Sequence, residues 1–129
     1  MAKILLVDDD PLHASVRKAI LGRKHSEVER VGDVAEALCL LEQHHYAQDV
    51  SLVVSSDQLS GIGLAGLISE LHVRMPGLPI LVIGEKRVSD GDFSGLPVEY
   101  LKRPVTADDL LNAVNQILKT WGQPQLKTA

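Results

Sequence analysis

Five short segments of apolar or alternating residues are spaced along the chain, and charged or turn-forming residues separate them. They cover positions 3–7, 27–31, 50–55, 79–83 and 98–101. The first, third and fourth are nearly continuous apolar runs, which is typical of strands that are covered on both faces. The pattern therefore predicts five strands, with these three in the middle of a sheet.

Between the predicted strands, apolar residues recur at spacings of three and four positions, which places them on one face of a helix. There are four such stripes: Leu12, Val16, Ala19 and Ile20; Val34, Ala37, Leu38 and Leu41; Leu64, Leu67, Ile68 and Leu71; and Leu110, Val114, Ile117, Leu118 and Trp121. Strands that alternate with helices indicate right-handed βαβ units and a parallel sheet. The sequence therefore predicts an α/β fold.

Three of these helices are preceded by residues that favour a helix start. Asp10 followed by Pro11 provides an N-cap and a proline in the first helical position, and Asp33 can cap the second helix. Thr106 and Asp109 have the spacing of a capping box at the start of the last helix. These signals support the helix boundaries that the apolar stripes indicate.

Length and charge narrow the class of protein. A chain of 129 residues suits one domain with a substantial core, so residues 1–121 are expected to form that domain and 122–129 a tail or the start of a linker. The formal net charge of −4 argues against a nucleic-acid surface. No apolar run approaches a membrane span and no signal peptide is visible, so a cytoplasmic protein without membrane contact is expected.

A cysteine and two histidines could suggest redox or metal chemistry. Cys39 is the one cysteine, which excludes an internal disulfide, and its apolar helical surroundings predict a buried, unreactive thiol. His44 and His45 are expected to close the second helix as surface groups that face its dipole, without binding a metal. Neither feature points to a site.

Three polar motifs lie at or near the ends of predicted strands. They are Asp8-Asp9-Asp10, Ser55-Ser56-Asp57-Gln58-Leu59-Ser60-Gly61 and Tyr100-Leu101-Lys102-Arg103-Pro104. Through these motifs the chain resembles the receiver domain of two-component response regulators, from Lys3 to about Lys119. The resemblance implies a doubly wound five-stranded parallel sheet in the order 2-1-3-4-5, flanked by helices in a CheY-like and flavodoxin-like three-layer sandwich.

The resemblance also implies the chemistry of the site. In that family an aspartate at the end of the third strand accepts a phosphoryl group, and acidic residues after the first strand hold Mg²⁺. Asp8 and Asp9 match the metal-binding positions, Tyr100 matches the aromatic residue that follows the switch, and Pro104 matches the proline of the fifth-strand motif.

The chain departs from the family pattern at three positions. Ser56 stands at the phospho-acceptor position, Gly84 stands where a switch hydroxyl is usual, and Arg103 replaces the lysine. Ser56 removes a nucleophilic carboxylate and one negative charge, so Mg²⁺ is expected to bind weakly at most. Arg103 is the expected counter-charge of Asp8 and Asp9. Together these changes favour a domain that has lost phosphotransfer.

Asp57 provides an alternative acceptor. A deletion of one residue in the turn that follows would align Asp57 with the family aspartate, and the domain would then be an ordinary phospho-accepting receiver with Mg²⁺. Neighbouring strand residues point to opposite faces, so Ser56 and Asp57 cannot both face the same pocket. The ungapped alignment favours Ser56, and both registers stay open.

The segment from Gly84 to Arg103 is about one helical turn shorter than the resemblance implies and has little helical periodicity. The fourth helix of the receiver pattern is therefore expected to be short, irregular or absent. Because the family signals through this helix, the fifth strand and the fifth helix, the output surface is expected to be remodelled.

The resemblance implies a signalling module that is not an enzyme, with self-catalysed phosphotransfer at most, and only if Asp57 is the acceptor. Its partners would be proteins: a sensor kinase, a signalling effector, or a second copy that binds the fifth strand and fifth helix. The leading hypothesis is a pseudo-receiver that acts by protein–protein interaction. A flavin- or nucleotide-binding protein is disfavoured, because three aspartates after the first strand are the electrostatic opposite of a phosphate-binding loop.

Overall fold

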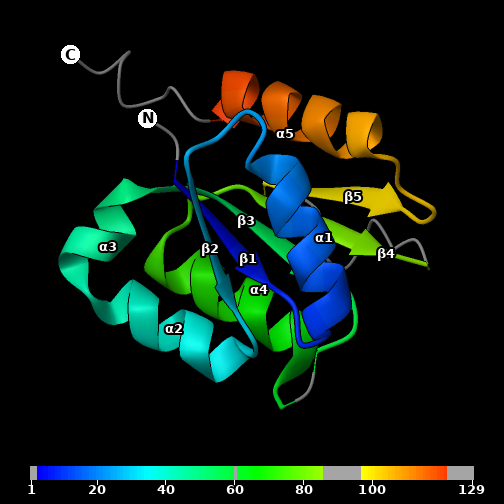
Figure 1. Ribbon diagram of the computed structural model, residues 1–129. Coiled ribbons are helices and arrows are strands. Elements are labelled where there is room, and N and C mark those ends of the chain that lie inside the picture. Colours follow the sequence, from blue (N-terminus) through cyan, green and yellow to red (C-terminus); the bar gives the residue numbers. More distant parts are fainter. Residues whose placement is uncertain (1–2, 60, 86–96, 122–129) are drawn as a thin grey trace.

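The computed structural model describes residues 3–59, 61–85 and 97–121, which form one sheet with helices on both faces (Figure 1). The strands are β1 (Lys3–Val7), β2 (Glu27–Val31), β3 (Val50–Ser56), β4 (Ile80–Gly84) and β5 (Val98–Lys102). All neighbouring pairs are parallel, and the order across the sheet is β2-β1-β3-β4-β5. The predicted α/β class, strand positions and strand order are confirmed.

The described helices are α1 (Pro11–Leu21), α2 (Val34–Glu42), α3 (His44–Asp49), α4 (Gly63–Arg74) and α5 (Ala107–Trp121). In Figure 1, α1 and α5 lie on one side of the sheet, and α2, α3 and α4 lie on the other. The helix that was expected to be short between β4 and β5 would fall in positions 86–96. That segment and the predicted tail, positions 122–129, lie outside the described residues.

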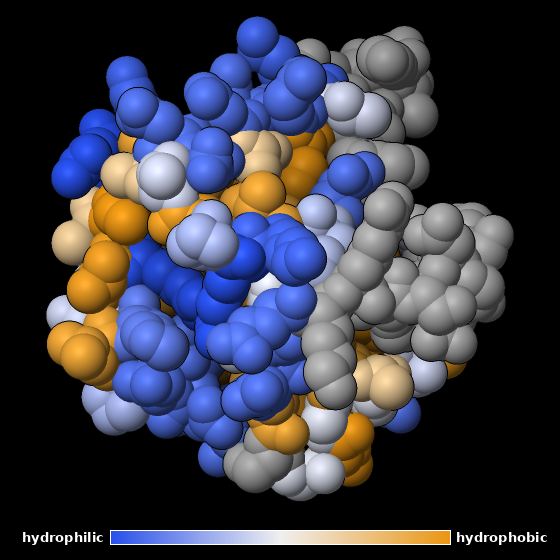
Figure 2. Space-filling model, turned by 90° about the vertical axis from the view of Figure 1, so that its right-hand side faces the viewer, coloured by the Kyte–Doolittle hydropathy of each residue, from blue (hydrophilic) through white to orange (hydrophobic). Residues whose placement is uncertain are grey.

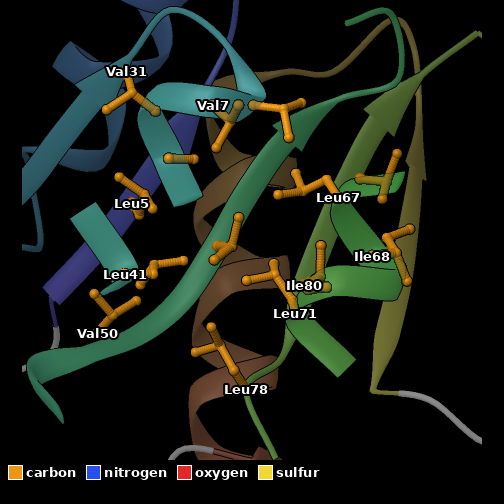
Figure 3. Packing of buried hydrophobic residues seen from close by; sticks show 14 residues of the cluster. Leu5, Val7, Val31, Leu41, Val50, Leu67, Ile68, Leu71, Leu78 and Ile80 are labelled. Atoms are coloured by element: carbon orange, nitrogen blue, oxygen red, sulfur yellow. The ribbon is translucent and has the colours of Figure 1, made fainter. Parts of the chain in front are cut away.

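Strand side chains alternate between two hydrophobic layers, one on each face of the sheet. One layer joins Leu5 and Val7 of β1 to the inward residues of two helices, namely Val34, Ala37 and Leu41 of α2 and Leu67, Ile68 and Leu71 of α4. Figure 3 shows labelled members of this layer converging from the helices and the strands. The stripes predicted for these two helices are confirmed.

The other layer lies between the sheet and the pair α1 and α5. Ile4 and Leu6 of β1 pack there with Ala14 and Leu21 of α1 and with Leu110, Val114 and Ile117 of α5. The stripe predicted for α5 is confirmed for its described members. Covering both faces of the sheet in this way explains why the central strands are continuous apolar runs.

The stripe predicted for α1 is wrong for Leu12, Val16 and Ala19, which are exposed, whereas Ile20 is partly buried and packs against the layer of α1 and α5. Leu12 is 71% exposed and Val16 is 51% exposed, although both were placed on the inward face. The inward face instead carries Ala14, Arg17 and Leu21, at spacings of three and four residues. Arg17 turns inward because its partner, a buried carboxylate, lies beneath the helix.

Two smaller predictions also need correction. Cys39 is exposed, because the inward face of α2 is made by Val34, Ala37 and Leu41 and the thiol lies off that face. His44 and His45 do not close α2, which ends at Glu42; they begin the separate six-residue helix α3. The extended backbone of Gln43 breaks the helix between them.

The predicted helix caps are confirmed. The Asp10 carboxylate accepts the N–H groups of Leu12 and His13 at 2.9 and 3.2 Å, which fixes the start of α1 directly after β1. The Asp33 carboxylate likewise accepts the N–H of Glu36 at 2.7 Å. These caps hold the first turns of α1 and α2 against the edge of the sheet where the strands end.

Candidate functional site

The predicted site residues gather at the edge of the sheet that is formed by the carboxyl ends of the strands. Asp8 follows β1, Ser56 ends β3, Gly84 ends β4 and Arg103 follows β5. Figure 2 views the molecule from the right-hand side of Figure 1, toward which β4 and β5 point, and hydrophilic residues gather in the middle of this face. In open parallel sheets, ligands bind beyond this edge, where the strand order reverses between β1 and β3.

Asp8 is the buried acid of this edge, with 1% of its surface exposed. Its Oδ1 accepts the backbone N–H of Asp10 at 3.0 Å, and its Oδ2 accepts a hydrogen bond from Arg17 Nη1 at 2.7 Å. Arg30 of β2 donates to the carbonyl oxygen of Asp8 from Nε at 3.1 Å and from Nη2 at 2.8 Å. Both carboxylate oxygens therefore already have partners within the chain.

The counter-charge of Asp8 is Arg17, so the expectation that Arg103 would take this role is wrong. Burial lowers the pKa of Arg17, Asp8 raises it, and the charge of Arg103 lowers it again. Arginine nevertheless stays protonated in proteins, so Arg17 supplies a permanent positive charge at this edge. Sequence reasoning missed Arg17 because one basic residue in an amphipathic helix gives no distinctive signal.

The other two members of the acidic triplet differ from Asp8. Asp9 is exposed, so the pair that was expected to act together is divided between the interior and the surface. Asp10 caps α1, and the N–H of His13 lowers the pKa of its carboxyl group. Each of the three acids thus has a different environment.

This edge does not fit a resident Mg²⁺ ion. Mg²⁺ requires hard oxygen ligands in an octahedral arrangement. The Asp8 oxygens are bonded to Asp10 and Arg17, and the guanidinium of Arg17 already provides the positive charge that a cation would bring. Within residues 3–59, 61–85 and 97–121, no group of three or more His, Cys, Asp or Glu side chains is placed to hold a metal.

Ser56 is buried at the end of β3, with 3% of its surface exposed. Its Oγ accepts the backbone N–H of Gln58 at 3.3 Å, and its carbonyl oxygen accepts the hydroxyl of Ser55 at 2.9 Å. No carboxylate or imidazole of the described chain hydrogen-bonds to this Oγ. A serine hydroxyl without an adjacent base is a poor nucleophile.

Asp57 bends back across the end of β4. Its backbone N–H donates to the carbonyl oxygen of Ile83 at 3.0 Å, and its Oδ2 accepts the backbone N–H of Glu85 at 3.2 Å. The other oxygen, Oδ1, is buried and has no hydrogen-bond partner in the part of the chain that the structure describes. The carboxylate is therefore fixed on one side and unsatisfied on the other.

Gly84 lies directly beneath this carboxylate. A Cβ atom added to Gly84 would lie 2.6 Å from the Cβ of Asp57 and closer still to its carboxylate group. Real Cβ atoms essentially never approach other heavy atoms so closely. The Asp57 side chain thus occupies the space that a residue with a side chain at position 84 would need, which explains the glycine.

Tyr100 and Arg103 come from the fifth strand and the residues that follow it. Tyr100 is partly buried and packs against the hydrophobic layer that contains α2 and α4. The Arg103 backbone N–H donates to the carbonyl oxygen of Gly84 at 2.8 Å, and the Arg103–Pro104 peptide bond is cis. The Nε atom of Arg103 is buried and has no hydrogen-bond partner among the described residues.

The predicted site residues lie at one edge of the sheet, but their contacts were not predicted from the sequence. Ser56, Asp57, Gly84 and Arg103 lie at one edge, and Asp57 and Gly84 pack directly on each other. Asp8 is instead bonded to two arginines that carried no motif signal, Arg17 and Arg30. At this edge, the charge of Asp8 is balanced by Arg17, and the hydroxyl of Ser56 has no adjacent base. The Asp57 carboxylate fills the space next to position 84.

No family model matches the chain. It is similar to the transcriptional regulatory protein AruR of Pseudomonas aeruginosa, with 30% identity over 121 residues. The match covers 91% of this chain and 49% of that regulator, so the chain spans about half the length of the curated relative it matches.

Solved structures agree with the fold over nearly the whole chain. A response regulator receiver domain protein from Clostridium thermocellum superposes with a TM-score of 0.81 at 22% identity, covering 93% of this chain and 96% of that one. A CheY-like receiver domain protein from Methanospirillum hungatei also gives a TM-score of 0.81, at 23% identity and with coverages of 95% and 98%.

The fold is therefore that of response regulator receiver domains, the CheY-like class. The sequence similarity to a regulatory protein agrees with this assignment, and the resemblance predicted from the sequence is confirmed. Receiver domains are in general signalling modules and not enzymes. In addition, no helix in the described part of the chain is long and apolar enough to cross a membrane.

Proposed function

We propose that the chain is a cytoplasmic receiver domain of two-component signalling that acts by protein–protein interaction without aspartyl phosphorylation. The observation that carries this proposal is the state of Asp8, whose two carboxylate oxygens are bonded to Arg17 and to the Asp10 N–H. Phosphoryl transfer to an acid needs a cation that neutralises the charge of donor and acceptor. The charge of Arg17 is already balanced by Asp8, so little positive charge is left to neutralise a phosphodonor and an acceptor.

The residues at the acceptor and switch positions support the same proposal. Ser56 offers a hydroxyl that no neighbouring base activates. Gly84 offers no hydroxyl that could bind a phosphoryl oxygen, and the space above it holds the Asp57 carboxylate. In such a domain no phosphorylation would shift the balance between conformational states, so its activity would not depend on a phosphodonor.

A second candidate function is phosphoryl acceptance at Asp57, and one observation favours it. The Oδ1 atom of Asp57 has no partner among the described residues, so one oxygen of this carboxylate is not engaged. Arg103, which follows β5 at the same edge of the sheet, could balance the charge of a phosphoryl group there. This candidate predicts a covalent adduct on Asp57 and no other residue.

Intact mass spectrometry after incubation with acetyl phosphate and Mg²⁺ tests the two candidates. The proposal predicts an unchanged mass for the wild-type domain, for Ser56→Ala and for Asp57→Asn, because no acceptor is competent. An adduct of one phosphoryl group on the wild type that disappears in Asp57→Asn would replace the proposal by the second candidate. An adduct that disappears in Ser56→Ala would identify serine as the acceptor.

The interaction surface that we assign to this function is the face of α5 and β5. A pocket of about 430 Å³ lies there, lined among others by Leu81, Tyr100 and Leu101 from the sheet and by Ala113 and Ile117 from α5. Pockets of this size with aromatic and aliphatic walls suit a protein side chain of a partner. A second copy of the chain is the occupant we propose.

Sedimentation velocity with and without acetyl phosphate tests the mode of action. We expect self-association that depends on protein concentration and is the same with and without the phosphodonor. Association that strengthens with the donor would support a phosphorylation switch instead. A monomer under both conditions would contradict the second copy as partner.

A further inference from the structure

A separate pocket lies between α1 and the start of α5. It has a volume of about 730 Å³, within the range of roughly 300–1,000 Å³ that is usual for small-molecule sites. Val16 and Ile20 of α1 form one apolar wall, and Leu110 of α5 lies in another. Arg17 and Arg103 provide the positive charges of the lining, which also includes Glu85 and His13.

The two arginines of this pocket are not equivalent. Arg17 is paired with Asp8 at 2.7 Å, so its charge is balanced from inside the protein. Arg103 has no ion pair within the described ranges, and its Nε is buried without a hydrogen-bond partner there. A buried donor of a charged group that is left unsatisfied is costly, and such a group calls for a partner.

The other groups of the pocket do not supply that partner. Glu85 also lines the pocket, but its side chain is exposed and forms no ion pair among the described residues. The start of α5 has a capping box of its own. Thr106 Oγ1 accepts the N–H of Asp109 at 3.0 Å, and Asp109 Oδ2 accepts the N–H of Thr106 at 3.3 Å. The helix start is therefore not an anion site. Arg103 is the group of this pocket that we consider as the binding partner of an anion, because its Nε has no hydrogen-bond partner among the described residues.

We propose that this pocket binds a small organic anion, whose carboxylate or phosphate group accepts hydrogen bonds from Arg103 and whose apolar body packs on Val16, Ile20 and Leu110. A guanidinium group presents donors in a planar fork that matches either oxygen acid. The apolar walls make an organic anion a better ligand than an inorganic one, since burying apolar surface adds to the affinity.

Nuclear magnetic resonance titration of the full chain is the test, with four probes: phenyl phosphate, benzoate, inorganic phosphate and benzyl alcohol. Saturable shifts of backbone amides in α1 and in positions 103–110 are expected for at least one of the two organic anions. The comparison of phenyl phosphate with benzoate identifies the oxygen acid. Benzyl alcohol and inorganic phosphate should each bind more weakly than the preferred organic anion.

Two substitutions that each remove one positive charge distinguish binding in this pocket from a general effect of the protein's charge. Arg103→Gln is expected to raise the Kd of the preferred anion about tenfold or more, as expected for the loss of a charge-assisted hydrogen bond. Lys102→Gln removes one charge at the adjacent, exposed position, which does not line the pocket, and should change the Kd by less than about twofold. If Arg103→Gln does not fold, Arg103→Lys serves in its place and should weaken binding because it lacks the planar fork.

Three results would each overturn the proposal. One is the absence of saturable shifts with both organic anions. Another is equal weakening of binding by Arg103→Gln and Lys102→Gln, because the attraction would then be a general charge effect. The third is inorganic phosphate binding as tightly as the preferred organic anion, because the apolar walls would then contribute nothing.

Discussion

At the scale of single residues, the contact between Gly84 and Asp57 decides what the site can do. The Asp57 carboxylate is bonded to the Glu85 N–H and lies over Gly84, so a side chain at position 84 requires the Asp57 side chain to move. The glycine therefore serves the packing of a neighbouring side chain, in addition to removing a hydroxyl. Residue type and contact together support the proposal that the usual switch does not operate at this position.

Gly84→Ala is expected to lower the free energy of unfolding by about 1–3 kcal/mol, because the added methyl group overlaps with Asp57. Urea denaturation measures the change. Gly77→Ala is the matched control, since a Cβ there meets nothing within 4 Å, and it should be neutral or slightly stabilising. In a double-mutant cycle with Asp57→Gly, a coupling below about 0.5 kcal/mol would contradict the contact.

Arg17→Gln should have two effects, because it leaves the buried Asp8 carboxylate without its counter-charge. Stability is expected to fall by about 3–5 kcal/mol, as when one partner of a buried ion pair is removed. In addition, Mg²⁺ should raise the melting temperature of the variant, since the freed carboxylate can bind it, but should leave the wild type unchanged.

Thermal melts with and without millimolar MgCl₂ measure both effects. The control is Arg23→Gln, which changes an exposed arginine just beyond α1 and should behave as the wild type. Stabilisation of the wild-type domain by Mg²⁺ would show that the Asp8–Arg17 pair does not exclude the metal.

At the scale of helices and strands, apolar periodicity predicted most elements but misplaced one helix face. It was correct for α2, α4 and α5 because their inward residues are aliphatic. It failed for α1, whose inward face contains Arg17, because a pattern of apolar residues cannot register a buried ion pair with a residue of another element. The exposed Leu12 and Val16 consequently looked like core residues.

The site shows the same limit. Its place at the strand ends followed from the fold class, because polar motifs ended the predicted strands. The contact of Asp57 with Gly84 did not follow, because it depends on how the chain leaves β3. Asp57 is the first residue beyond β3, where the alternation of side chains along a strand no longer fixes their direction.

Thr106→Ala tests whether the capping box sets the start of α5. The substitution removes the oxygen that accepts the Asp109 N–H and should lower stability by about 0.5–2 kcal/mol. Hydrogen exchange should become faster in the first turn of α5 but not in its centre near Val114. Thr120→Ala, at an exposed position near the other end of the same helix, should change neither quantity.

At the scale of the whole molecule, the helices protect both faces of the sheet, and α5 with β5 leaves a pocket open on one side. A protein that signals without modification must offer its partner surface at all times. The pocket lined by Ala113 and Ile117 meets this condition within the described chain. The second copy that we propose as its occupant would connect this fold to the proposed function.

Ala113→Glu should weaken self-association at least about tenfold, because it places an uncompensated charge in the contact. Sedimentation equilibrium gives the dissociation constant. Val73→Glu is the matched control: Val73 is 78% exposed on α4, on the opposite face of the sheet, and its substitution should leave association unchanged. Equal effects of the two substitutions would place the contact elsewhere.

The overlap of Asp57 with position 84 also constrains how this sequence could change over generations. A threonine or serine at position 84 can be accommodated only after the Asp57 side chain has been shortened or redirected. The order of substitutions toward a phospho-accepting site therefore matters. Ser56→Asp by itself would create an acid, but position 84 would still lack the hydroxyl that could hydrogen-bond to a phosphoryl group. A path that begins at position 84 passes through a variant that is destabilised by the overlap with Asp57, whereas a path that begins by shortening residue 57 avoids this overlap. The first route is therefore less accessible than the second.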